Sequence, residues 1–365
     1  MSEWQTFCLK DLGKIVGGAT PSTNNPKNYG NKIAWITPKD LSTLQGRYIK
    51  KGSRSISRLG FKSCSTFLLP KHAILFSSRA PIGYVAIAKK RLCTNQGFKS
   101  IIPNKKIYFE FLYYLLKYHK DSISNIGGGT TFKEVSGATL GLFKVKIPPT
   151  YYEQQKIART LSILDQKIEN NHKINELLHT LAYKIYEYYF KHKPKNAKLE
   201  QIIIENPKSS IMVKNAQKTQ DKYPFFTSGD NILSYPKAII DGRNCFLNTG
   251  GNAGIKFYVG KASYSTDTWC ICANEFSDYL YLLLSNIKTH INQSFFQGTS
   301  LKHLQKNLLK KYPIYMPSAH EIKKFNQIIM PLLTLISINT RTSKKLEQIR
   351  DFLLPILLKQ QVKPQ

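Results

Sequence analysis

Thr150-Tyr151-Tyr152-Glu153 follows a proline and opens a long amphipathic stretch, and Ser318-Ala319-His320-Glu321 does the same near the end of the chain. In the same way, Gly129-Thr130-Thr131 is repeated as Gly298-Thr299-Ser300, about 169 residues later. A solenoid repeat is much shorter, roughly 20–50 residues. The sequence therefore predicts a duplicated domain in which each copy is followed by a long helix.

Both predicted helices begin with a capping signal. The hydroxyl of Thr150 or Ser318 can accept a hydrogen bond from a free backbone N–H, and Glu153 or Glu321 can reach back to complete a capping box. We expect the second helix to kink, or to start and stop, near Pro331 and Pro355, because each proline removes a helix hydrogen bond.

Both helices carry seam residues at coiled-coil spacing, so we expect them to pack against each other as an antiparallel pair. About 38 residues of helix would span about 57 Å at 1.5 Å per residue. This matches the scale of contacts one or more DNA turns apart, each roughly 34–36 Å. The predicted seam of the first helix is Ile157, Leu164, Asn171, Ile174, Leu178, Leu181, Ile185 and Tyr188. The predicted seam of the second is Phe325, Ile328, Leu332, Leu335, Asn339, Thr342, Leu346, Ile349, Leu353 and Ile356.

Two asparagines, Asn171 and Asn339, fall at equivalent seam positions, 168 residues apart. A buried asparagine weakens a coiled coil but fixes its register and choice of partner. Alternatively, each side chain faces solvent at a gap in the seam. We assign both residues to helix register.

The chain divides into four segments: a mixed domain at 1–149, a helix at 150–196, a second mixed domain at 197–318, and a helix with a tail at 319–365. Short apolar runs between Gly, Pro and Asn turns predict strands, and a longer run predicts a helix at Phe109–Tyr118. The second domain repeats this order, with its matching helix at Phe276–Leu284. The predicted fold class is α+β, with two mixed α/β domains separated by two long antiparallel helices forming a coiled coil with pseudo-two-fold symmetry. The strand-like runs of the first domain are Ile33–Ile36, Ala73–Phe76, Tyr84–Ala88 and Lys99–Ile102.

The net charge is +32, and it is concentrated in residues 1–149, which carry +18 against +6 in residues 197–318. Between Asp40 and Glu110 there are 14 Lys and Arg residues and no acidic residue. Such a field attracts a polyanion, and we expect double-stranded DNA. Solvated surface lysines are the alternative. A membrane surface would instead favour a basic amphipathic helix. The N-terminus lacks a signal peptide and the most apolar window is too short to span a bilayer, so we expect a cytoplasmic protein without a membrane anchor.

Motifs of catalysis are missing from the sequence. There is no phosphate loop, dinucleotide fingerprint or adenine methyltransferase motif, and the histidines and six cysteines show no metal-ligand spacing. We therefore predict no catalytic residue and no metal ligand in this chain. A nuclease site stays open as an alternative, because carboxylates distant in sequence can meet in space.

Several motifs resemble those of the specificity subunits of type I restriction–modification systems. They include Trp35-Ile36-Thr37-Pro38-Lys39-Asp40, Thr94-Asn95-Gln96-Gly97-Phe98 and Glu153-Gln154-Gln155-Lys156-Ile157-Ala158. The resemblance covers essentially the whole chain. The second copy departs from it, with His320-Glu321-Ile322-Lys323 at the helix start and two prolines in its helix.

The resemblance implies a non-catalytic subunit with two target-recognition domains, each reading one half of a bipartite DNA site. The helices would set the spacer and dock two modification subunits, and separate restriction subunits would translocate and cut. This chain would hold no cofactor of its own, while S-adenosylmethionine, ATP and Mg²⁺ would belong to the partner subunits. The alternatives are a specificity module of another restriction system and a solitary subunit whose partners are lost.

Candidate DNA contacts follow from side-chain chemistry, since Arg and Lys bind phosphate and guanine whereas Asn and Gln suit adenine. In the first domain we predict Lys39, Arg47, Lys50, Lys51, Arg54, Arg58, Arg79 and Gln96. In the second we predict Lys222, Ser228, Lys237, Arg243, Asn252, Lys256 and Thr268.

Overall fold

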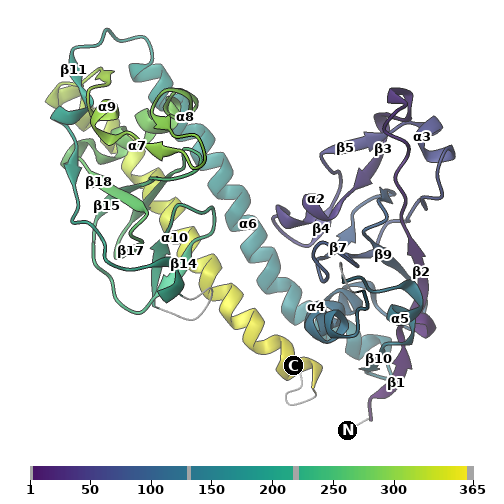
Figure 1. Cartoon of the computed structure of the whole chain (residues 1–365). Helices are drawn as coiled ribbons and strands as arrows, with labels where there is room; N and C mark the ends of the chain where they lie inside the picture. Colours follow the sequence, from purple (N-terminus) through teal and green to yellow (C-terminus); the bar gives the residue numbers. More distant parts are fainter. Residues whose placement is uncertain (1–2, 130–132, 217–221, 360–365) are drawn as a thin grey trace. The chain divides into compact units, whose positions relative to one another are not determined.

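The computed structural model describes residues 3–129, 133–216 and 222–359. The chain forms two compact units, residues 1–169 with 349–365 and residues 170–348. Two 40-residue helices, α6 (Tyr151–Phe190, teal in Figure 1) and α10 (Ala319–Leu358, yellow), each contribute to both units. The predicted repeat element Thr130-Thr131 lies outside the described residues.

The first unit contains ten strands and five shorter helices among its described residues. The strands are β1 (Gln5–Cys8), β2 (Gly13–Gly17), β3 (Tyr29–Ile36), β4 (Tyr48–Ile49), β5 (Arg54–Ile56), β6 (Ile74–Phe76), β7 (Val85–Ala88), β8 (Cys93–Thr94), β9 (Lys99–Pro103) and β10 (Lys144–Ile147). The helices are α1 (Leu9–Leu12), α2 (Pro38–Ser42), α3 (Arg58–Lys62), α4 (Phe109–Asn125) and α5 (Gly137–Leu142). The sheets have the strand orders β2-β9-β6-β7-β4, β5-β3-β8 and β1-β10.

The core of the first unit forms where α4 packs on β6 and β7. Residues 110–116 of α4 are all buried, as expected for a helix segment enclosed on several sides, whereas only Ile123 is buried in the rest of the helix. The first turns of α6 add Ile157 and Leu161 to this core, and the last turns of α10 add Leu354 and Leu357. The two long helices therefore both contribute to the core of the first unit.

The second unit has the same plan. Its strands are β11 (Ala197–Lys198), β12 (Ile204–Glu205), β13 (Tyr223–Phe226), β14 (Leu233–Tyr235), β15 (Arg243–Asn248), β16 (Ile255–Val259), β17 (Ser263–Tyr264), β18 (Thr268–Cys272), β19 (Phe296–Gln297), β20 (His303–Leu304) and β21 (Pro313–Ile314). Its shorter helices are α7 (Ser277–Asn286), α8 (Lys288–Ser294) and α9 (Lys306–Lys310). The two larger sheets have the strand orders β12-β18-β15-β16 and β14-β13-β17.

The core of the second unit mirrors that of the first with the roles of the long helices exchanged. Here the end of α6 contributes Phe190 and the beginning of α10 contributes Phe325, whose ring centroids lie 4.9 Å apart. Tyr279 of α7 packs edge-on against Phe190, with ring centroids 5.1 Å apart. Each unit is thus built on the start of one long helix and the end of the other.

The beginnings of both long helices are capped as predicted. The hydroxyl of Thr150 accepts from the Glu153 N–H at 3.2 Å, and the hydroxyl of Ser318 accepts from the Glu321 N–H at 3.3 Å. In the second helix the Ser318 N–H donates to Glu321 at 2.9 Å, which completes the capping box. Of the two outcomes expected near Pro331 and Pro355, a helix that starts and stops there is wrong, because α10 continues through both. A kink at either proline stays a prediction.

The capping carboxylate should make the stability of the second unit depend on pH. The Ser318 N–H and the Tyr315 hydroxyl donate to Glu321 and lower its pKa from 4.5 to about 2. A depressed carboxyl pKa stabilises the fold above the unfolded pKa, and this contribution is lost as the pH falls from 4.5 towards 2. Denaturant unfolding should therefore show a constant advantage of the wild type over Glu321→Gln at pH 6–7, shrinking below pH 4.5. A difference independent of pH would contradict this assignment.

The predicted antiparallel pairing of α6 and α10 is confirmed. In the second unit Asn171 donates to Ser343 at 3.2 Å and Asn175 donates to Thr340 at 3.4 Å, and in the first unit the Arg350 guanidinium donates to Asp165 at 2.7 Å. Residue numbers rise along α6 as they fall along α10.

The composition of the seam differs from the prediction. Ile174, Leu181 and Tyr188 of α6 are exposed, as are Ile328, Leu335 and Ile349 of α10. Other residues of the two helices are buried instead, including Asp165, Ala182, Ile336 and Ser343. Apolar size alone therefore misplaced the seam, because a second apolar stripe runs beside it.

Candidate nucleic-acid interface

The basic surface of the first unit is organised around Asp40. This carboxylate accepts from the Thr37 N–H at 2.8 Å and from the Ser53 N–H at 2.7 Å, which ties the start of α2 to the segment before β5. Burial raises the pKa of Asp40, but the hydrogen bonds from Ser53 and Thr37 outweigh it and hold the pKa below its usual value. The carboxylate thus stays ionised and binds the two basic segments together.

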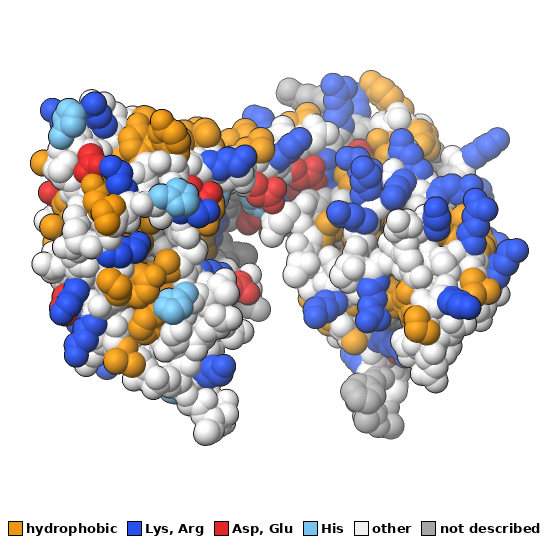
Figure 2. All heavy atoms as spheres, turned by 90° about the horizontal axis from the view of Figure 1, so that it is seen from above, with side chains coloured by type: hydrophobic (Ala, Val, Ile, Leu, Met, Phe, Trp, Pro, Cys, Tyr) orange, Lys and Arg blue, Asp and Glu red, His pale blue; other side chains and the backbone are white. Residues whose placement is uncertain are grey.

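Five of the predicted contacts lie exposed on or near this junction: Lys39, Lys50, Lys51, Arg54 and Arg58. Lys39 lies on α2, and Lys50 and Lys51 lie in the segment that Asp40 holds. Arg54 lies over the ring of Tyr29, 5.5 Å from its centroid. Figure 2 shows one face of this unit, on the right, on which Lys and Arg side chains are spread.

Arg47 is a correction to the predicted set. Its side chain is 3% exposed and donates to Glu169 at 3.0 Å and to Glu110 at 3.3 Å. The guanidinium is therefore held inside the first unit, against α4 and α6. To reach DNA, this guanidinium would have to break its ion pairs with both carboxylates. We therefore regard Arg47 as a structural residue and remove it from the predicted DNA contacts.

Arg79 and Gln96 lie on turns at one end of the first unit. Arg79 is partly exposed and pairs with Glu134 at 3.3 Å. Gln96 is exposed and accepts a hydrogen bond from the hydroxyl of Thr20. Both side chains are placed where a ligand can reach them.

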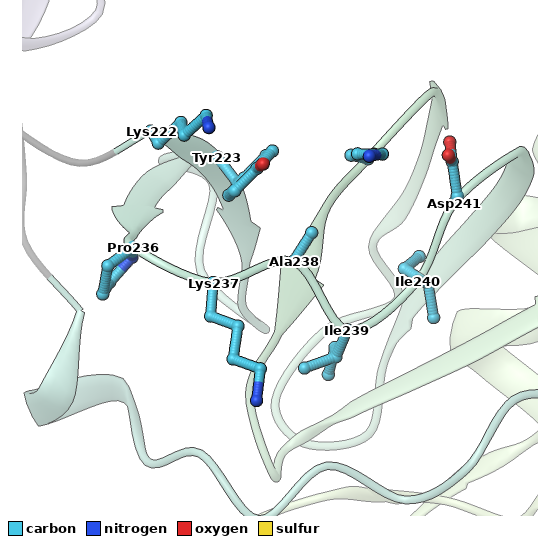
Figure 3. Close-up of a pocket in the computed structure, with 9 residues that line it drawn as sticks. Lys222, Tyr223, Pro236, Lys237, Ala238, Ile239, Ile240 and Asp241 are labelled. Carbon is cyan, nitrogen blue, oxygen red and sulfur yellow. The ribbon is translucent and has the colours of Figure 1, made fainter.

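In the second unit, Lys222 and Lys237 come together at an open pocket of about 540 Å³. Figure 3 shows both around the stretch Pro236 to Asp241. Lys261, absent from the predicted set, also lines this pocket and adds a third cation. Sequence spacing gave no signal for Lys261, because it reaches the pocket from the turn before β17.

Three other predicted residues of this unit have structural roles. Arg243 pairs with the buried Asp278 and donates to the Met330 carbonyl at 3.2 Å. The ammonium of Lys256 donates to the Thr227 carbonyl at 2.7 Å, and burial lowers its pKa. Thr268 is 7% exposed, so it is not placed to touch DNA. Arg243 is not placed to do so either, because its guanidinium is held by Asp278 and Met330.

The remaining two predicted residues are Ser228 and Asn252. Ser228 donates to the Asp267 carbonyl, and its oxygen accepts from the Thr249 N–H at 3.2 Å. Its hydroxyl therefore stabilises the local backbone by joining the segments at Asp267 and Thr249. Asn252 is exposed in the turn between β15 and β16.

The helix pair contains a pair of related polar bonds. Asn171 donates to Ser343, and Asn339 donates to Asn175 at 2.9 Å. In the repeat, Asn171 corresponds to Asn339 and Asn175 corresponds to Ser343. The two hydrogen bonds therefore join equivalent pairs of positions. Asn175 was missed because Ile174 beside it fits an apolar seam better. That these asparagines set the helix register stays a prediction.

Other kinds of site find little support in the part of the chain that the structure describes. Within it, no three His, Cys, Asp or Glu side chains gather as metal ligands would. Among the same residues, no helix is both long enough and apolar enough to cross a membrane. The basic surfaces and the helix pair are thus the candidate functional features.

Comparison with known proteins defines the class of protein. The sequence matches the type I restriction modification DNA specificity domain over residues 1–180 and 195–348. The chain therefore belongs to the family of type I restriction–modification specificity subunits. This class fits DNA sequence recognition. Specificity subunits are non-catalytic, which agrees with the missing motifs.

Individual relatives match the chain over different lengths. The type I restriction enzyme MjaIX specificity subunit of Methanocaldococcus jannaschii is 33% identical over 403 aligned residues, covering 98% of this chain and 93% of that protein. The HindI specificity subunit of Haemophilus influenzae is 30% identical over 177 residues, 46% of this chain and 37% of that protein. The crystal structure of the M. genitalium S subunit has the same fold, with a TM-score of 0.64 at 18% identity, covering 97% and 96% of the two chains.

Proposed function

We propose that the two recognition domains each read one half of a bipartite DNA site and that α6 and α10 fix the unread spacer between the halves. The observation that carries this proposal is a common scaffold with unlike side chains. Strands β6 and β15, and helices α4 and α7, occupy equivalent places in the repeat, while the turns beside them differ in sequence and charge. A shared scaffold with different turns suits two different half-sites.

We also assign the exposed apolar stripes of the helix pair to the docking of modification subunits. On α6, Ile174, Leu177, Leu181 and Tyr188 recur at helical spacing outside the seam, and Tyr188 is 86% exposed. Large contiguous apolar surface is unusual on a protein that stays alone in water. In this proposal S-adenosylmethionine, ATP and Mg²⁺ are bound by the partner subunits.

Methylation mapping tests the proposal directly. The chain is co-expressed with its modification subunits in a host without other methyltransferases, and modified bases are located across the genome. We expect a split motif with methylated adenine on both strands and a fixed spacer. A continuous palindrome, or methylation without a motif, would contradict the two-domain proposal. A complex lacking this chain is the control and should leave the genome unmodified.

The exposed lysines of the first domain predict a specific salt dependence. Replacing Lys50 and Lys51 together with alanine should weaken binding to all duplexes alike and reduce the slope of log K against log salt by about two units. Lys184→Ala on α6 is the control, because this lysine is exposed but lies outside the basic surface. Binding titrations at several salt concentrations measure the slope. An unchanged slope in the double variant would remove these lysines from the interface.

A further inference from the structure

Two hydrogen bonds place the same pair of positions side by side in both domains. In the first domain the Ser78 N–H donates to the Gly97 carbonyl at 2.8 Å, and the Ser78 carbonyl accepts from the Val135 N–H at 3.0 Å. In the second, the Thr249 N–H donates to the Asp267 carbonyl at 3.2 Å, and the Thr249 carbonyl accepts from the Leu304 N–H at 3.0 Å. Arg79, which follows Ser78, therefore corresponds to Gly250, which follows Thr249. In the same way Glu134, which precedes Val135, corresponds to His303, which precedes Leu304.

The side chains at these equivalent positions differ completely. The first domain has Arg79 and Glu134, whereas the second has Gly250 and His303, which form a bridge. The backbone at Glu134 is fixed independently of its side chain, since it exchanges two hydrogen bonds with Gly128, at 2.9 and 3.0 Å. An identical backbone frame with unrelated side chains is what a position that sets specificity requires.

In the first domain these side chains form an ordered ion cluster. Glu134 accepts from Arg79 Nη1 at 3.3 Å and from Lys99 Nζ at 3.2 Å, one cation on each oxygen. The side chains of Arg79 and Glu134 are 37% and 34% exposed, so the cluster faces solvent. The net charge of this cluster is +1, so the carboxylate of Glu134 does not make this part of the surface repel DNA.

The geometry leaves a guanine-reading surface on Arg79. The pair with Glu134 uses Nη1, and among the described residues neither Nε nor Nη2 has a hydrogen-bond partner. These two donors are parallel and match O6 and N7 of guanine in the major groove. An arginine without an anchor would instead be free to move to a phosphate, which carries no sequence information.

Resting on the proposed function, we infer that Glu134 is a positioning residue that holds Arg79 for a guanine in the first half-site. Glu134→Gln removes the charge that anchors Arg79 while keeping the size of the side chain. Discrimination at one base pair of the first half-site should fall roughly tenfold, the range for one bidentate base contact. The second half-site should be unaffected.

The experiment determines the DNA motif of the complete methyltransferase complex by selection from randomised duplexes. The wild type is compared with Glu134→Gln, Arg79→Ala and Glu176→Gln, the last making the same charge change on the exposed face of α6. We expect Glu134→Gln and Arg79→Ala to relax the same base pair, and Glu176→Gln to leave the motif unchanged. A purely structural effect would weaken binding to all sequences instead of one position.

Three outcomes would overturn the inference alone, and two of them concern Glu134→Gln: a motif identical to the wild type, or relaxation at a base pair other than the one that Arg79→Ala affects. Relaxation of the same base pair by Glu176→Gln would also overturn it, because charge alone would then explain the effect. A wild-type complex without any two-part motif would instead overturn the proposed function on which the inference rests.

Discussion

Replacing Asp165 with asparagine should lower the free energy of unfolding of the first unit by about 3–5 kcal/mol, the usual cost of removing one partner from a buried ion pair. Asp165 is 5% exposed and accepts from Arg350 at 2.7 Å and from the Tyr114 hydroxyl at 2.6 Å. Arg47 lies 4.0 Å away. Without this carboxylate, two guanidinium groups remain in a poorly solvated site with reduced compensation.

Asp351→Asn provides the matched control for Asp165→Asn. Asp351 also pairs with Arg350, at 2.8 Å, but is 50% exposed, so its removal should cost about 1 kcal/mol or less. Denaturant unfolding should be followed with probes in each unit, because a chain with two compact units need not unfold in one step. Equal effects of the two substitutions would show that the burial of Asp165 carries no special weight.

Replacing Arg243 with alanine should destabilise the second unit by about 3–5 kcal/mol and leave the salt dependence of DNA binding unchanged. The substitution strands Asp278, whose side chain is 2% exposed. Burial already raises the pKa of Asp278 and Arg243 opposes this rise, so the pKa should climb further in the variant. An acid with a raised folded pKa destabilises most at high pH, so the deficit should shrink as the pH falls towards 3.8.

Lys237→Ala should show the opposite behaviour to Arg243→Ala. This lysine is exposed at the pocket of the second unit, so its loss should leave stability within about 0.5 kcal/mol and reduce the salt slope by about one unit. Unfolding and salt titrations of both variants separate the two roles. A reduced salt slope in Arg243→Ala without loss of stability would return Arg243 to the DNA contacts.

The elements of this fold could largely be predicted because local patterns determine them. The run from Phe109 predicted α4, and the run before Leu284 predicted α7, although α4 extends seven residues beyond the prediction to Asn125. The expectation that α10 stops at its prolines failed because a sequence pattern does not include the packing that holds a helix together. Helical stability comes mainly from such tertiary contacts.

The candidate contacts were predicted less well because charge is visible in a sequence and its partner is not. Arg47 and Arg243 look like their exposed neighbours, but Glu169 and Asp278 lie 122 and 35 residues away. The same reasoning hid Glu134, which pairs with Arg79 across 55 residues. Only the fold shows which cations are already paired.

The last turns of α10 have a consequence for biosynthesis. Leu354 and Leu357 complete the core of the first unit, and Arg350 supplies the partner of Asp165, yet these residues are the last part of the described chain to leave the ribosome. The first unit therefore cannot close its core until residues 349–358 have been synthesised, although domains usually fold in the order of synthesis. In a nascent chain stopped before Ile349, the apolar core surface and the carboxylate of Asp165 would stay uncovered and accessible to chaperones and proteases. Folding of the first unit thus depends on prior synthesis of the whole second unit, residues 170–348.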